Sequence, residues 1–252
     1  MAVDVRVPEP ADSSAYGAAV DILRRAEVLW DTVGDPDAFP FALPAVRGLD
    51  GLGFPTPVTF LVGENGSGKS TVVEALAAVA GLSPEGGNRD IRVATRGTES
   101  PLADHLRLVF GTRPRSAFFL RSETFFHVAG VYAGLLGRGD LGARSHGEAV
   151  IDSVTSDLFT AGGLYLMDEP EAGLSFLGQL KLLRQAHQLV AGGSQLVAAT
   201  HSPILLAFPG ATIYQLDDDG IHPTAYEDTD AYQLTRSFLD APDRFLAPLL
   251  ED

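Results

Sequence analysis

The sequence of 252 residues contains no cysteine, and only two of its 18 basic residues, Lys69 and Lys181, are lysines. The absence of cysteine excludes disulfide bonds and thiolate metal sites. No apolar run approaches the ~18 residues that span a bilayer, so we expect no transmembrane segment. The first residues, MAVDVRVPEPADSS, are acidic and proline-rich and do not resemble an export signal. We therefore expect a cytoplasmic protein.

Positive charge is also scarce, because the formal net charge is -15. Nonspecific coating of nucleic acid needs clustered lysine and arginine to neutralise phosphates, so this overall charge argues against that class of protein. The charge is uneven, however. Residues 89–144 hold nine arginines against five acidic residues, which gives +4 there and -19 elsewhere. Such a segment is typical of a solvated surface of mixed sign or of a partner-binding face, and both interpretations stay open.

The chain does contain a glycine-rich stretch, GENGSGKST, directly after the apolar run VTFLV at 58–62. The stretch fits the phosphate-loop pattern G-x-x-x-x-G-K-[ST], in which glycines let backbone N–H groups turn around an anion. The lysine supplies charge to the phosphates and the serine a hydroxyl to Mg²⁺. A helix predicted over 71–80 would point its positive end at the same anion. The residues expected to hold the triphosphate are Gly63, Glu64, Asn65, Gly66, Ser67, Gly68, Lys69, Ser70 and Thr71.

Hydrolysis of a bound triphosphate also needs a metal-holding carboxylate and a group that activates water. The stretch GLYLMDEPEAGLS places Asp168 and Glu169 directly after a predicted buried strand at 164–167. Asp168 is predicted to hold Mg²⁺ together with Ser70, and Glu169 is predicted to face the γ-phosphate as general base. The alternative is a pair of solvated loop carboxylates.

A histidine follows the next apolar strand, in SQLVAATHSP. A lone histidine is most often structural. If this strand lies beside the one that ends in Asp168, His201 instead reaches the γ-phosphate and orients the attacking water. Lys69, Glu169 and His201 would then be the catalytic residues.

The order of phosphate loop, Asp-Glu strand and strand-terminal histidine resembles that of the ATP-binding cassette (ABC) ATPases. RSHGEAV at 144–150 resembles the family signature LSGGQ or LSGGE, with His146 in place of a glycine. In that family the segment caps the γ-phosphate bound to the opposite subunit. The resemblance therefore implies ATP contacts for Ser145, Gly147 and Glu148, and an ATP-dependent homodimer. Ser145 and Glu148 also form a capping box, so an ordinary helix start is the alternative.

Two further family loops have counterparts of different quality. PEAGLS at 170–175 resembles the D-loop. The glutamine of the family's Q-loop is missing after the predicted strand at 117–120, where Ser122 and Glu123 stand instead. Glu123 is predicted to take the metal-side role, with a solvated turn as the alternative.

The resemblance extends over the whole chain, to small stand-alone AAA-family, ABC-like ATPases related to the head domains of chromosome-maintenance and recombination ATPases. It implies an α/β P-loop NTPase fold in one domain, 1–252, with a mostly parallel central sheet. The region up to Thr56 is expected to supply antiparallel strands, and a small helical signature subdomain is expected at about 124–159. Trp30, Phe39 and Phe41 are candidates to stack on the base.

These patterns together predict an Mg²⁺-dependent ATPase that works as an ATP-sandwiched dimer. The process it drives is first interpreted as DNA repair, genome maintenance or defence, with a nucleic acid or effector protein bound by residues 89–144. The alternative is the ATP-binding subunit of a membrane transporter, against which the missing Q-loop glutamine and the altered signature count. A nucleotide-sensing switch with little turnover is the third possibility.

Overall fold

A seven-stranded sheet with the strand order β3-β5-β6-β7-β2-β8-β9 forms the centre of the protein. The computed structural model describes residues 21–88, 101–124 and 159–250. The five inner strands run parallel, and the short β3 and the hairpin strand β9 pair antiparallel at the two edges. The strands are β2 (Val58–Val62), β3 (Gly87–Asn88), β5 (Ala117–Arg121), β6 (Leu164–Asp168), β7 (Gln195–Ala199), β8 (Thr212–Asp217) and β9 (Gly220–Thr224).

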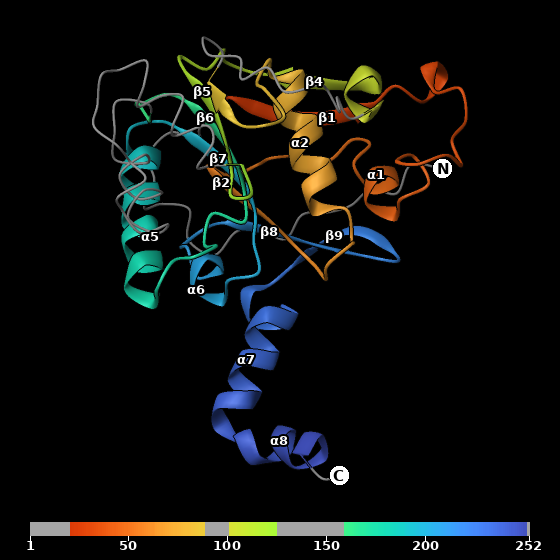
Figure 1. Cartoon of the computed structure of the whole chain (residues 1–252). Helices are drawn as coiled ribbons and strands as arrows, with labels where there is room; N and C mark the ends of the chain where they lie inside the picture. The colour runs from red at the N-terminus through yellow and green to blue at the C-terminus, as the bar shows by residue number, and fades with distance from the viewer. Residues whose placement is uncertain (1–20, 89–100, 125–158, 251–252) are drawn as a thin grey trace.

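The inner strands are short apolar runs because both faces of the sheet are covered. Every residue of β2, β6 and β7 is buried, as expected for parallel strands packed between two layers. One layer consists of α2 (Lys69–Val79) and a separate two-stranded sheet, β1 (Leu23–Val28) with β4 (Leu106–Phe110) (Figure 1). The other consists of α5 (Phe176–Ala191) and α6 (Pro203–Leu206).

A buried glutamine joins the small sheet to the central one. The side chain of Gln195, at the start of β7, accepts a hydrogen bond from Leu23 N at 2.7 Å and donates one to Leu23 O at 3.0 Å. The amide therefore pairs both backbone groups of Leu23. This contact fixes β1 over the strand that carries His201 at its other end.

Four short elements in the described chain lie between the longer strands and helices. They are the helix α1 (Pro44–Gly48), which packs on β9, and the 3₁₀ turns η2 (Trp30–Thr32), η3 (Pro101–His105) and η5 (Tyr226–Asp228). None of the helices in the described part of the chain is long and apolar enough to cross a membrane.

The strands predicted at 58–62, 117–120 and 164–167 are confirmed, the last two with one more residue each. Helix α2 begins at Lys69 rather than Thr71, because Gly68 in the left-handed region caps it. The antiparallel pair differs from expectation: β1 lies before Thr56, but its partner β4 follows the phosphate-loop helix. The helical signature subdomain predicted at about 124–159 falls almost entirely outside the described residues.

The last two helices, α7 (Asp230–Asp240) and α8 (Pro242–Leu250), extend away from the rest of the protein (Figure 1). Neither helix has a buried residue in the described structure. Thr229, which is fully buried, caps α7 by accepting a hydrogen bond from Tyr232 N at 3.3 Å. The attachment of this helical arm therefore lies in its first turn.

We expect a chain that ends at Gln233 to keep the stability of the full chain. It retains Thr229 and the ring contact between Tyr226 and Tyr232, while the deleted residues bury no core. Surface changes of this kind alter the free energy of unfolding by about 0.5 kcal/mol, so calorimetry should show a Tm shift of less than about 3 °C. A drop of more than about 10 °C would mean that the arm packs into the folded core.

Candidate functional site

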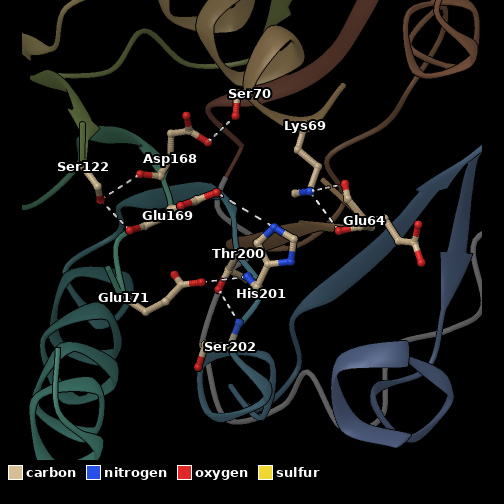
Figure 2. Close-up of polar contacts among 11 residues, drawn as sticks. Glu64, Lys69, Ser70, Ser122, Asp168, Glu169, Glu171, Thr200, His201 and Ser202 are labelled. Carbon is tan, nitrogen blue, oxygen red and sulfur yellow. Dashed lines mark hydrogen bonds and ion pairs between the residues drawn. The ribbon is translucent and has the colours of Figure 1, made fainter. Parts of the chain in front are cut away.

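Three loops meet where the parallel strands β2, β6 and β7 end. Strand β7 lies between the other two, and its register pairs Leu61 with Ala199 and Ala199 with Asp168. Ligands of open parallel sheets bind outside the carboxyl ends of the strands. The loop after β2 carries the glycine-rich stretch, the loop after β6 carries Glu169, and the loop after β7 carries His201 (Figure 2). The three stretches singled out from the sequence therefore lie side by side.

The glycine-rich loop has the backbone of an anion cradle. Gly63, Gly66 and Gly68 all have positive φ values, and a Cβ at Gly63 would lie 2.3 Å from Leu216 O. The buried Lys69 ammonium donates hydrogen bonds to the carbonyl oxygens of Gly63 and Glu64, each at 2.8 Å. Burial lowers the pKa of Lys69, and the carboxylates of Glu169 and Asp168 oppose that change. The ammonium thus lies at the mouth of the loop, where phosphate oxygens would accept the same protons.

Two hard oxygen ligands lie together beside this loop. The Ser70 hydroxyl, in the first turn of α2, donates to Asp168 Oδ1 at 3.1 Å. Burial raises the pKa of Asp168 to about 6, and the Ser70 hydrogen bond opposes the increase. Carboxylate oxygens are among the hard ligands that Mg²⁺ prefers. Ser70 and Asp168 therefore fit the metal role predicted for them.

Glu169 stands in a strained conformation. Its φ of 50° is the only positive value among the described non-glycine residues, and such a backbone persists only where surrounding contacts hold it. Its N–H donates to Ala199 O at 2.9 Å, and its carbonyl accepts a hydrogen bond from the Ser122 hydroxyl. These contacts turn the side chain toward the opening of the site, where it is about half exposed.

His201 faces the same opening from the loop after β7. Its Nε2 lies 3.9 Å from Glu169 Oε1 (Figure 2). Burial lowers the pKa of His201, the Lys69 charge lowers it further, and Glu169 opposes both. A neutral imidazole at pH 7 follows from this direction. It can donate a hydrogen bond to a phosphate oxygen or accept one from water.

The residues at the end of β5 make contacts that differ from the prediction. The Glu123 carboxylate is largely exposed and pairs with Arg121 at 3.1 Å, and Arg121 also pairs with Glu74 at 2.9 Å. Among its described contacts there is none with Ser70, so the metal role predicted for Glu123 has no support in this geometry. The Glu123 carboxylate instead pairs with the Arg121 guanidinium. Ser122, to which we gave no role, is the residue that contacts the catalytic loop, through the carbonyls of Asp168 and Glu169.

The structure separates the three aromatic candidates for base stacking. Phe41 is 6% exposed in the core, and Trp30 packs against it with ring centroids 6.3 Å apart. Phe39 is 72% exposed and lines a cavity of about 250 Å³ together with Lys69, Ser70, Thr71 and Glu169. Only Phe39 presents a free ring face to the phosphate site.

A larger cavity of about 650 Å³ adjoins the outer side of the glycine-rich loop, at Glu64, Asn65, Gly66 and Ser67. Four aspartates line it: Asp217, Asp218, Asp228 and Asp230. This acidic lining repels phosphate, whereas the smaller cavity is lined by the cationic Lys69. Ser145, Gly147 and Glu148, which were predicted to cap the ATP of a second subunit, lie outside the described residues.

Comparison with known proteins agrees with this geometry. A family model described as an AAA domain matches residues 44–110. The chain is 32% identical over 183 residues to the cytochrome c biogenesis ATP-binding export protein CcmA of Rhodopseudomonas palustris (strain BisB5), covering 66% of this chain and 92% of that protein. It is 28% identical over 207 residues to the energy-coupling factor transporter ATP-binding protein EcfA2 of Streptococcus sanguinis (strain SK36), covering 71% and 73%. A nucleotide-free ATP-binding cassette from an ABC transporter shares the fold at 17% identity and a TM-score of 0.50, covering 88% and 96%.

Proposed function

This chain belongs to the ATP-binding cassette ATPases and hydrolyses ATP, and we propose that the reaction depends on Mg²⁺ and on Ser70, Asp168, Glu169 and His201. The ATP would be sandwiched between two subunits. One observation supports this most. Lys69, Ser70 and Glu169 line one cavity, Ser70 bonds to Asp168 at 3.1 Å, and His201 lies 3.9 Å from Glu169.

The phosphates and the metal have separate partners in this proposal. Lys69 exchanges its two carbonyl partners for β- and γ-phosphate oxygens, and the N–H groups at the start of α2 add the helix dipole. Ser70 and Asp168 would hold Mg²⁺, which would supply positive charge next to the phosphates. The distance of 3.1 Å between the Ser70 and Asp168 oxygens supports the assignment of both residues as metal ligands.

Glu169 and His201 would act on the water. The strained backbone of Glu169 aims its carboxylate into the opening, so it can accept a proton from a water in line with the γ-phosphate. The neutral His201 ring would donate to a γ-phosphate oxygen and keep that water in place. A general base near the nucleophile typically contributes at least ~10²-fold to the rate.

A second subunit would complete the site. Glu169 and His201 side chains are 46% and 41% exposed, although phosphoryl transfer gains from exclusion of bulk water. Ser145 and Gly147 of a partner subunit are the groups proposed to cover the γ-phosphate, as the family resemblance implies. ATP would then close the dimer and hydrolysis would open it.

For the process that the cycle drives, we favour the ATP-binding subunit of a membrane transporter. The names of the relatives CcmA and EcfA2 both support an export or transport role. The earlier interpretation as a DNA-maintenance protein is weaker, because two of the four described arginines of its predicted contact face are already paired with carboxylates. Arg107 binds Glu27, and Arg121 binds Glu74 and Glu123.

The two processes can be separated by two measurements. In its native host, a tagged chain should sediment with membranes and co-purify after detergent extraction with one integral membrane protein that raises its rate of phosphate release. In the absence of membranes, duplex DNA should leave the rate unchanged from about 50 to 200 mM salt. DNA-stimulated turnover that falls as salt rises would instead favour the DNA-maintenance process.

Phe39→Ala is expected to raise the KM for ATP about 10-fold while kcat changes less than about 3-fold. Stacking of a base on an aromatic ring contributes about 1–3 kcal/mol, and 1.4 kcal/mol corresponds to tenfold. Phe39→Trp should restore the KM, since it supplies a larger ring. Steady-state phosphate release across an ATP titration tests this, and an unchanged KM in the alanine variant would remove Phe39 from the binding site.

A further inference from the structure

The loops that carry Glu169 and His201 leave the sheet before they reach the cavity. The parallel ladder of β6 and β7 ends at the pair Asp168 and Ala199, and one further backbone bond, Glu169 N to Ala199 O at 2.9 Å, follows it. Beyond that point the two loops need another connection, because the catalytic side chains must keep a fixed separation.

Glu171 supplies that connection. Its side chain leaves the loop after β6, and its Oε1 accepts a hydrogen bond from His201 N at 2.7 Å (Figure 2). Burial raises the pKa of Glu171, and hydrogen bonds from the Thr200 side chain and the His201 backbone N–H oppose the increase. A half-buried carboxylate that accepts an N–H gives a stronger hydrogen bond than a neutral acceptor.

Compared with the neighbouring contacts, Glu171 links the loop after β6 to the loop after β7 close to Glu169 and His201. On the far side of His201, Ser202 N donates to Thr200 Oγ1 at 3.0 Å, and the Ser202 hydroxyl donates to Gln179 of α5. These contacts fix the start of α6 against α5. Gln179 also donates to Leu174 O at 3.4 Å, so these contacts reach the loop of Glu169 only at its far end, next to α5.

Glu171 is poorly placed to act on ATP itself. Its carboxylate accepts hydrogen bonds from the His201 backbone N–H and the Thr200 side chain, and Glu171 does not line the cavity that contains Lys69 and Glu169 (Figure 2). Glu169, two residues earlier, occupies the opening. The two glutamates of this loop therefore have different positions and different partners.

We propose that Glu171 is a positioning residue for ATP hydrolysis, whose carboxylate holds the His201 backbone against the loop that carries Glu169. The proposal rests on the function proposed above, in which His201 acts on the γ-phosphate and its water. It adds that a side chain helps to set the separation of Glu169 and His201, beyond the backbone bonds of Glu169 N to Ala199 O and of Thr200 N to Leu61 O.

The test compares Glu171→Ala with Glu171→Gln. The alanine variant loses the acceptor for His201 N–H, and its kcat should fall at least about 10-fold. Its KM for ATP should stay within about 2-fold, because the phosphate loop is untouched. The glutamine variant keeps an oxygen at the same place and should retain at least about a third of the kcat. A general structural role would instead lower Tm and kcat together in both variants.

A double-mutant cycle with His201→Ala separates the two proposals. In the His201→Ala protein, adding Glu171→Ala should change kcat less than about 2-fold, since the residue being positioned is already missing. Additive losses, or wild-type kcat in Glu171→Ala beside an impaired His201→Ala, would overturn the positioning role and leave the proposed function standing. Wild-type kcat in His201→Ala alone would overturn the proposed role of His201.

Discussion

Glu169→Gln protein is expected to bind ATP with near wild-type affinity, hydrolyse it at least ~10²-fold more slowly and accumulate as a dimer. Glutamine keeps the volume of the side chain and an oxygen toward the cavity, but it cannot take a proton from water. The contacts of Lys69 and Ser70 are unaffected, so binding should survive. Phosphate release and light scattering in the presence of ATP and Mg²⁺ measure the two effects.

A matched control is Glu227→Gln, the same chemical change at an exposed position that does not line the cavity of Lys69 and Glu169. It should hydrolyse ATP at the wild-type rate and show no stable dimer. If Glu169→Gln binds ATP but stays monomeric, the sandwiched arrangement is wrong. If it retains the wild-type rate, another residue activates the water and the role given to Glu169 is wrong.

Asp168→Asn is expected to change activity and stability in opposite directions. Loss of one charged metal ligand should lower the hydrolysis rate at least ~10²-fold, since bound metal contributes several kcal/mol to stabilising the transition state. Without metal and nucleotide, however, the ionised Asp168 is a buried charge, only 6% exposed, and the Arg121 charge offsets its desolvation only in part. Asparagine keeps the oxygen that accepts from Ser70 and removes that charge.

The pH dependence of this stability gain follows from the pKa of about 6, which lies above the ordinary 3.8. The folded protein holds this proton more tightly than the unfolded chain, so wild-type stability falls as pH rises from about 4 to about 6. At pH 7.5 the variant avoids a cost of up to ~3 kcal/mol, which corresponds to a Tm increase of about 5–10 °C. Near pH 5 the gain should be about half as large.

Calorimetry in EDTA at the two pH values measures the gain. Asp219→Asn, at an exposed turn position between β8 and β9, is the control and should leave Tm within about 2 °C. A gain of the same size at pH 5 and pH 7.5 would show that Asp168 is not the titrating group. A lower Tm in the variant at pH 7.5 would mean that the carboxylate has a stabilising partner.

The sequence by itself determined the elements that depend on near neighbours in the chain. The glycine spacing from Gly63 to Gly68 specifies a loop backbone that other residues adopt only with strain, whatever surrounds it. An apolar run of four or five residues followed by a polar one predicts a buried strand with a functional group at its end. For these reasons the strands at 58–62 and 164–168 could be predicted together with the residues that end them.

Tertiary structure decided which of several neighbouring residues makes a given contact. Phe39 and Phe41 are two positions apart, but packing against Trp30, His105 and the core buries Phe41, whereas Phe39 lies at the cavity. Glu123 was predicted at the metal, but Arg121 binds its carboxylate, and Ser122 contacts the catalytic loop instead. Glu171 meets His201 across 30 residues of chain. Local patterns carry no information on such meetings, because the free energy of each contact depends on which distant groups the folded chain brings into reach.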